Sequence, residues 1–197
     1  MSREEVMRII INLLTPRDLV ISTTGKLSRE LYEYREMCGD RHGNDFLTVG
    51  SMGHASSIAM GIAARRPDRH VFCFDGDGSV IMHMGALAII GQSGLKNFLH
   101  IVFNNGAHDS VGGQPTVGFG VNIPLIAKAC GYHEALSVSE PADIEKALSR
   151  FKRIDGPALL EIRIKTGARS DLGRPKSTPH ENRDAFMTNL ISTKSVN

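Results

Sequence analysis

Residues 70–79 read His-Val-Phe-Cys-Phe-Asp-Gly-Asp-Gly-Ser, an apolar run followed at once by an acidic turn between glycines. The run has the pattern of a buried strand, and a helix is predicted after the turn, from about Val80 to Gly91. The same order recurs at residues 98–106, where Phe-Leu-His-Ile-Val-Phe leads into Asn-Asn-Gly. Strands that end in such turns and alternate with helices indicate a parallel sheet covered on both faces.

The same alternation extends to both ends of the chain. The sequence predicts an α/β fold of three layers, a mostly parallel sheet of about six strands with helices on both faces. Ser2-Arg3-Glu4-Glu5 has the form of a capping box and opens the first helix. Residues 106–121 are glycine-rich without a hydrophobic period, so a long loop is predicted there. We expect residues 1–164 to form one domain and residues 165–197 to form a polar tail with a short helix.

The composition excludes several classes of protein. Of 197 residues, 41% are hydrophobic and 22% are charged, which is typical of a globular domain rather than a disordered chain. The net charge of +2 gives no sign of nucleic-acid binding, and no apolar run is long enough for a membrane helix. Three cysteines without a CxxC pair argue against a disulfide framework or a zinc site, so a reducing cytoplasm is expected.

Four strand ends carry glycine together with small polar residues. They are Thr24-Gly25, Gly50-Ser51-Met52-Gly53, Gly76-Asp77-Gly78-Ser79 and Asn105-Gly106. Ligands of open parallel sheets bind outside the carboxyl ends of the strands, where these turns are predicted to lie. Structural turns between strands and helices also need glycine, so the alternative of ordinary turns stays open.

The residue types in these turns favour phosphate chemistry through a metal ion. A helix that starts after a glycine turn favours a phosphate, but Asp77 would repel it unless the carboxylate holds a bridging cation. Asn104 and Asn105 end the next strand and offer amide oxygens, which suit Mg²⁺. A dinucleotide fingerprint is not met because position 81 is Ile rather than Gly, and no GxxxxGK[ST] motif is present.

Gly76-Asp77-Gly78, followed after 25 residues by Asn104-Asn105, resembles the thiamine diphosphate-binding motif of thiamine-dependent enzymes. The resemblance extends over nearly the whole chain. Residues 22–26, 48–55, 104–108, 111–118 and 167–175 together resemble the C-terminal half of phosphonopyruvate decarboxylases. The β subunit of sulfopyruvate decarboxylases, in which the cofactor domain is a separate chain, is a close relative of that family.

The resemblance implies a role for each matching residue. Asp77, the amide of Asn105 and the carbonyl of Ala107 would ligate Mg²⁺. The Gly50 carbonyl would accept a hydrogen bond from the 4′-amino group of the cofactor, and Met52 would be the apolar wedge beneath it. The residues expected to approach the diphosphate are Gly76, Gly78, Ser79, Thr24 and Gly25.

The substrate side is less defined. His54 and His108 are candidates for substrate binding or proton transfer, because histidine titrates near neutrality. Arg169 and Arg174 are candidates for recognising a dianionic phosphonate, and the tail that carries them is a candidate active-site lid. A solvated tail is the competing interpretation. His100 and Cys73 lie within predicted strands and are expected to be core residues.

The resemblance implies decarboxylation of a 2-oxoacid with thiamine diphosphate and Mg²⁺, foremost of phosphonopyruvate to phosphonoacetaldehyde and CO₂. The family's activating Glu lies on a pyrimidine-binding domain, and no Glu here matches it, so a partner domain or subunit and a homo- or hetero-oligomer are expected. The chain alone is expected to be inactive. Two alternatives stay open: a sulfopyruvate decarboxylase β subunit, and a non-catalytic module for cofactor binding or assembly.

Overall fold

The computed structural model describes residues 1–40 and 42–192. The helices are α1 (Arg3–Asn12), α2 (Lys26–Met37), α3 (Ala55–Arg65), α4 (Asp77–Met82), α5 (Gly85–Gly91), α6 (Ile123–Cys130), α7 (Pro141–Phe151) and α8 (Pro179–Ser192), with 3₁₀ turns η1 (His42–Asn44) and η2 (Asp109–Val111). The strands are β1 (Leu19–Ser22), β2 (Asp45–Leu47), β3 (Val71–Gly76), β4 (Phe98–Asn104), β5 (Ala107–His108), β6 (Gln114–Pro115), β7 (Glu134–Val138) and β8 (Ala158–Arg163).

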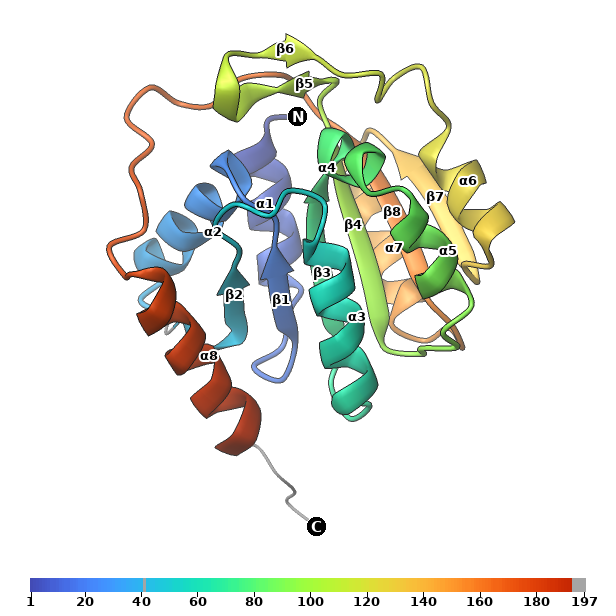
Figure 1. Ribbon diagram of the computed structural model, residues 1–197. Coiled ribbons are helices and arrows are strands. Elements are labelled where there is room, and N and C mark those ends of the chain that lie inside the picture. Colours follow the sequence, from blue (N-terminus) through green and yellow to red (C-terminus); the bar gives the residue numbers. More distant parts are fainter. Residues whose placement is uncertain (41, 193–197) are drawn as a thin grey trace.

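Six strands form one sheet in the order β2-β1-β3-β4-β8-β7, and every neighbouring pair is parallel. The predicted α/β class and strand number are therefore confirmed. The central strands β3 and β4 are buried almost throughout because helices cover both faces. All six strands end at the same edge, which lies at the top of Figure 1.

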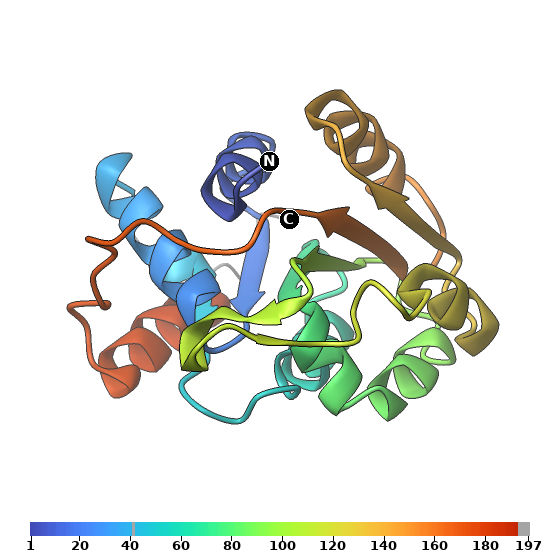
Figure 2. The same ribbon diagram turned by 90° about the horizontal axis from the view of Figure 1, so that it is seen from above.

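Two layers of helices enclose the sheet, as the view from above shows (Figure 2). Helices α1, α2 and α7 pack on one face and bury side chains such as Ile10, Leu31 and Phe151. Helices α3, α5, α6 and α8 pack on the other face, where Ala59, Ile90 and others are buried. Burial of these apolar side chains is the main favourable contribution to folding. None of the described helices has the length and apolar character needed to cross a bilayer.

Two local predictions are wrong. The predicted helix from Val80 to Gly91 is two helices, because α4 starts at Asp77, directly after β3, and ends at Met82. His83 leaves helical geometry ahead of Gly85, a residue that costs a helix interior about 1 kcal/mol relative to alanine. The predicted loop over residues 106–121 contains a small hairpin, β5–β6, which lies above the ends of the central strands in Figure 1. Two-residue strands are too short to show a hydrophobic period.

The tail crosses the carboxyl edge before it forms α8 (Figures 1 and 2). Asn182 anchors α8 to the edge strand β2, since its Oδ1 accepts from the backbone N–H of Leu47 at 2.9 Å and its Nδ2 donates to the Asp45 carbonyl at 2.9 Å. Phe186 is buried on the face of the sheet that α3, α5 and α6 also cover. Residues 193–197 of the expected tail lie outside the described residues.

Candidate functional site

A cavity of about 210 Å³ opens at the carboxyl edge of the sheet, where β1, β3 and β4 end. We call it the carboxyl-edge cavity. Residues singled out from the sequence line most of it: Thr24, Gly25, Met52, Gly76, Asp77, Gly78, Ser79, Asn105, Ala107 and His108. Because parallel strands end at one edge, residues far apart in the sequence meet here, such as Thr24 and His108, which are 84 positions apart.

Asp77 lies at the start of α4 and is 1% exposed. Burial raises the pKa of its carboxyl group, whereas hydrogen bonds from the Thr116 hydroxyl and from the backbone N–H groups of Asn105 and Gly78 act in the opposite direction. The Thr116 hydroxyl donates to Oδ2 of Asp77. A carboxylate buried in this way is stabilised by a cation beside it.

The β5–β6 hairpin and its following turn are fixed against Asp77 by a buried polar network. Nδ2 of Asn104 donates to the Gly118 carbonyl at 2.9 Å and to Oε1 of Glu161 at 2.7 Å. Oδ1 of Asn104 accepts from the backbone N–H of Gly106 at 3.1 Å. A Cβ on Gly118 would overlap the Asp77 carboxylate and would lie 2.7 Å from Oδ1 of Asn104. Glycine is therefore required at position 118 for this close approach.

The amide of Asn105 is oriented by Asp109. Its Nδ2 donates to Oδ2 of Asp109 at 2.8 Å, and its Oδ1 accepts from the backbone N–H of Ala107 at 3.1 Å. Oδ2 of Asp109 also accepts from the Arg3 guanidinium and from the Gly167 N–H at 3.0 Å. The first helix and the tail therefore meet at the residue that holds Asn105.

Residues 50–53 form a strained turn beside the cavity. Ser51 adopts a left-handed backbone with φ of 48°, which is uncommon for a residue with a side chain. The turn is held at both ends, since Gly50 N–H donates to Oγ1 of Thr24 at 3.1 Å and Gly53 N–H donates to Oγ of Ser79 at 3.0 Å. Met52 lines the cavity, whereas Gly50 is exposed and is not part of the lining.

The two histidine candidates lie in different places. The His108 ring packs over Gly78, since a Cβ there would lie 2.8 Å from its Nδ1, and His108 lines the cavity. His54 is exposed at the start of α3 and lies outside the lining. Its ring packs against that of His83, with the ring centroids 4.2 Å apart. The structure thus brings only His108 to the cavity.

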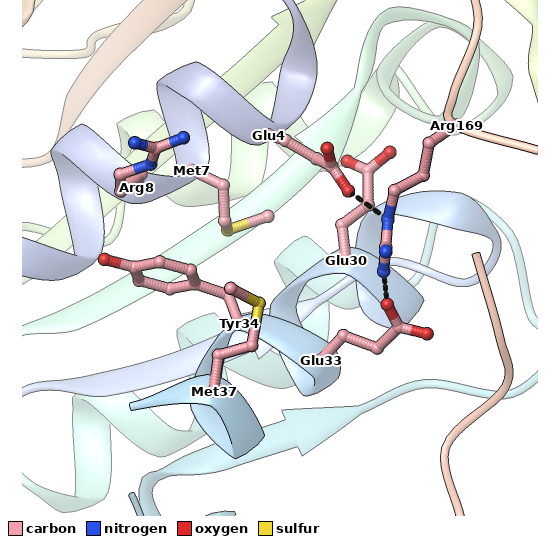
Figure 3. A pocket seen from close by; sticks show the side chains of 8 residues that line it. All are labelled: Glu4, Met7, Arg8, Glu30, Glu33, Tyr34, Met37 and Arg169. Carbon is pink, nitrogen blue, oxygen red and sulfur yellow. Dashed lines mark hydrogen bonds and ion pairs between the residues drawn. The ribbon is translucent and has the colours of Figure 1, made fainter. Parts of the chain in front are cut away.

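The two arginine candidates also lie outside this lining. Arg169 bridges α1 and α2, where its Nε donates to Oε1 of Glu4 at 2.8 Å and its Nη2 pairs with Glu33 (Figure 3). Arg174 lines a neighbouring cavity that shares Thr24 and Gly25 with the carboxyl-edge cavity. The tail therefore presents its two arginines to separate surroundings.

The donor set at the carboxyl-edge cavity fits a hard divalent cation. The Asp77 carboxylate, the Asn105 amide oxygen and the Ala107 carbonyl are oxygen donors at one cavity, which is the chemistry that Mg²⁺ prefers. In the sheet interior, Cys73, Asp75 and His100 have ligand atoms within 4.8 Å of one another. His100 bonds Asp75 at 3.4 Å and Tyr132 at 3.2 Å, and burial raises the pKa of the Cys73 thiol, so we interpret this second set as core.

Comparison with known proteins identifies the class. Residues 23–162 match the family described as "Thiamine pyrophosphate enzyme, C-terminal TPP binding domain", and the chain belongs to this family. A solved structure, a thiamine diphosphate-dependent 4-hydroxybenzoylformate decarboxylase of Rhodococcus jostii RHA1, has a TM-score of 0.71 at 18% identity. It shares the fold over 85% of this chain and 33% of its own length.

The curated proteins most useful for comparison are decarboxylases. A phosphonopyruvate decarboxylase of Streptomyces viridochromogenes is 44% identical over 84% of this chain and 41% of its own length. A sulfopyruvate decarboxylase β subunit of Methanocaldococcus jannaschii is 38% identical over 66% of each chain. The chain thus spans about two fifths of the phosphonopyruvate decarboxylases it matches, at 41% and 43% of their lengths.

Sequence reasoning missed the residues that surround the predicted ligands. Arg3 reaches Asp109 across 106 positions and Thr116 reaches Asp77 across 39, whereas Asp109 holds Asn105 from four positions away. Arg3 is buried, although it is a charged residue in the first turn of α1, directly after the N-cap Ser2. The short Asn105-to-Asp109 spacing is a local signal that could have suggested their contact.

Proposed function

We propose that this chain is the cofactor-binding part of a thiamine diphosphate- and Mg²⁺-dependent 2-oxoacid decarboxylase, foremost one that converts phosphonopyruvate to phosphonoacetaldehyde and CO₂. The observation that carries the proposal is the convergence of Asp77, Asn105 and Ala107 at the carboxyl-edge cavity. The likeness to phosphonopyruvate decarboxylases supports the substrate.

Different residues of the cavity would bind the metal ion and the diphosphate. Oxygen atoms of Asp77, Asn105 and Ala107 would hold Mg²⁺, and backbone groups of Gly76, Gly78 and Ser79 would face the diphosphate with Thr24 and Gly25. When bound, thiamine diphosphate supplies the electron sink for the loss of CO₂.

The remaining candidates act around that centre. The Gly50 carbonyl would accept from the pyrimidine amino group, and Met52 would shape the apolar floor. His108 packs on Gly78 and lines the cavity, so its ring would serve in substrate binding or proton transfer. His54 and Arg169 would contribute through a partner or the tail, since neither lines the cavity. The tail segment, which crosses this edge in Figure 2, would act as a lid.

A pyrimidine-binding domain or subunit completes the proposal. No Glu from the described part of the chain lines the carboxyl-edge cavity, so the activating carboxylate would come from that partner. We propose a homo- or hetero-oligomer and a cytoplasmic enzyme, in keeping with three cysteines that form no disulfide with one another in the described residues.

A specific observation favours a second candidate, the β subunit of a sulfopyruvate decarboxylase. The relative with that name matches over 66% of its own length, more than the phosphonopyruvate decarboxylases do. A non-catalytic module for cofactor binding or assembly is the third candidate.

Reconstitution separates the three. The chain is mixed with a pyrimidine-domain half of a relative, thiamine diphosphate and Mg²⁺, and CO₂ release is measured from phosphonopyruvate, sulfopyruvate and pyruvate. Turnover foremost of phosphonopyruvate supports the main proposal, and turnover foremost of sulfopyruvate supports the second. Cofactor binding without turnover of any of these would indicate the non-catalytic module, and fast turnover by the chain alone would contradict the need for a partner.

A further inference from the structure

A second cavity, of about 310 Å³, adjoins the carboxyl-edge cavity and shares Thr24 and Gly25 with it. We call it the tail cavity. It lies between the first turn of α2, the end of β2 and the part of the tail that leads into α8. A ligand bound in the tail cavity would therefore lie next to a ligand bound in the carboxyl-edge cavity.

Two arginines face the tail cavity without a counter-ion. Arg29 comes from α2 and Arg174 from the tail, and in the part of the chain that the structure describes neither makes a hydrogen bond or an ion pair with its side chain. The lining contains no Asp or Glu. Two like charges at one cavity repel each other, and an anion between them removes that cost.

The nearby carboxylates are engaged elsewhere. Glu33 accepts from the Gly173 N–H at 2.6 Å and pairs with Arg169, while Glu36 pairs with Lys176 at 3.7 Å and with His42. These contacts compensate the negative charge on α2 and leave the guanidinium groups of Arg29 and Arg174 free.

The wall of the tail cavity is held in place on both sides of Arg174. The backbone of Gly173 is tied to α2, and Asn182 is tied to β2 by two hydrogen bonds. Two hydroxyl groups of the lining already donate to protein carbonyls, that of Ser28 to Thr23 at 2.6 Å and that of Thr48 to Ser22 at 3.0 Å. Arg29 and Arg174 are thus the charged donors of this wall, and the described residues give their side chains no partner.

We propose that Arg29 and Arg174 form a subsite for a tetrahedral oxyanion, and that it receives the phosphonate or sulfonate group of the substrate. The guanidinium fork matches such a group through paired N–H donors, which an ammonium cannot do. The inference rests on the proposed function and deepens it: the substrate class is a 2-oxoacid with a second, strongly acidic oxyanion. Arg29 was not among the residues singled out from the sequence.

The test is a titration of the intact chain with methylphosphonate, methanesulfonate and acetate in Tris chloride, followed by ligand line broadening in NMR spectra. The proteins are wild type, Arg29→Gln, Arg174→Gln, Arg29→Lys and a matched control, Arg65→Gln. Arg65 is exposed at the end of α3, and the described residues likewise give its side chain no partner.

The expected result is saturable binding of methylphosphonate or methanesulfonate, at least tenfold tighter than acetate. Arg29→Gln and Arg174→Gln should each weaken it about tenfold, Arg29→Lys should restore part of the loss, and Arg65→Gln should stay within twofold of wild type. Preference for methylphosphonate or for methanesulfonate distinguishes the two substrate sources. Equal binding by wild type and both glutamine variants, or no saturable binding by wild type, would overturn the subsite.

A second readout keeps this test apart from the proposed function. Binding of thiamine diphosphate with Mg²⁺ is measured on the same proteins. Loss of the oxyanion site with unchanged cofactor binding supports the subsite, whereas absent cofactor binding with an intact oxyanion site would count against the proposed function alone.

Discussion

The carboxyl-edge cavity and the groove between α1 and α2 differ in a way that size does not reveal. The groove is the larger, at about 360 Å³ against about 210 Å³. Its lining includes the largely apolar side chains of Met7, Tyr34 and Met37, and at its acidic end Arg169 bridges Glu4 and Glu33 (Figure 3). The smaller cavity collects oxygen donors from three strand ends. Convergent polar groups, rather than volume, mark the candidate site.

Each of the two regions also contains a buried carboxyl group with a raised pKa, Glu30 in the groove and Asp77 in the cavity. In the groove, Oε1 of Glu30 is buried without a hydrogen-bond partner, and burial raises the pKa of Glu30 to about 7 although Oε2 accepts from Arg3 at 2.9 Å. In the carboxyl-edge cavity, burial likewise raises the pKa of Asp77, and the groups that partly offset it are a hydroxyl and backbone N–H groups rather than a guanidinium. Glu30 already pairs with Arg3, so we expect protonation to relieve the remaining cost of its unpartnered oxygen, whereas we expect a bound cation to stabilise Asp77.

The largest effect should follow Gly118→Ala. The added methyl group would overlap the Asp77 carboxylate, so we expect Mg²⁺-dependent affinity for thiamine diphosphate to fall about 100-fold, or about 3 kcal/mol. The matched control is Gly120→Ala, where the nearest atom, the Val117 carbonyl oxygen, is 3.5 Å from the new Cβ. Calorimetry should separate the two variants, and equal affinities would contradict the close approach at Gly118.

Glu30 should give the next effect, on stability rather than binding. Its folded pKa of about 7 exceeds the ordinary value of 4.5, so the folded state binds the proton more tightly than the unfolded state. The stabilisation amounts to about 3 kcal/mol, is complete below pH 4.5 and is lost as the pH rises through about 7. Denaturant unfolding at pH 5 and pH 8 should show this loss in wild type and not in Glu30→Gln. The same loss of stability in wild type and Glu30→Gln would show that a group other than Glu30 causes it.

Thr116→Val should have a smaller effect on the cavity. It removes the hydroxyl that donates to Asp77 and accepts from the Gly118 N–H at 3.0 Å, without changing the size of the side chain. We expect cofactor affinity to fall about tenfold, or about 1.4 kcal/mol. Thr188→Val is the control, since its hydroxyl donates to the Asp184 carbonyl on the distant α8. An unchanged affinity for Thr116→Val would show that Asp77 needs no such support.

Arg169→Gln should have the smallest effect. It tests whether the groove between α1 and α2 is independent of the carboxyl-edge cavity. The bridge to Glu4 and Glu33 is partly exposed, so its loss should cost less than about 1 kcal/mol of folding stability. Affinity for thiamine diphosphate should stay within twofold of wild type. A tenfold loss of that affinity would show that the groove and the carboxyl-edge cavity are coupled through the tail.

Features that depend on local sequence pattern could be predicted from the sequence. Strand ends are visible as apolar runs that stop at glycine, and parallel strands share an edge, so Asp77 and Asn105 could be placed together in advance. The break between α4 and α5 and the short hairpin were not visible, because neither alters a period over enough residues.

Contacts made across long sequence separations could not be predicted. Arg3 reaches Asp109 across 106 positions, and Asn104 reaches Glu161 across 57, through packing of whole elements. Arg169 shows the same limit, since its sequence context suggests an anion-binding tail, whereas its surroundings are two glutamates of α1 and α2. Charge alone does not tell a salt bridge from a ligand contact.

The most direct test of the central claim is calorimetric titration of the chain with thiamine diphosphate, with and without Mg²⁺, on wild type and Asp77→Ala, alone and with a pyrimidine-domain partner. We expect binding that requires Mg²⁺ and is abolished by Asp77→Ala. Equal binding by Asp77→Ala, or no binding by wild type even with the partner present, would contradict the assignment of the carboxyl-edge cavity as the cofactor site.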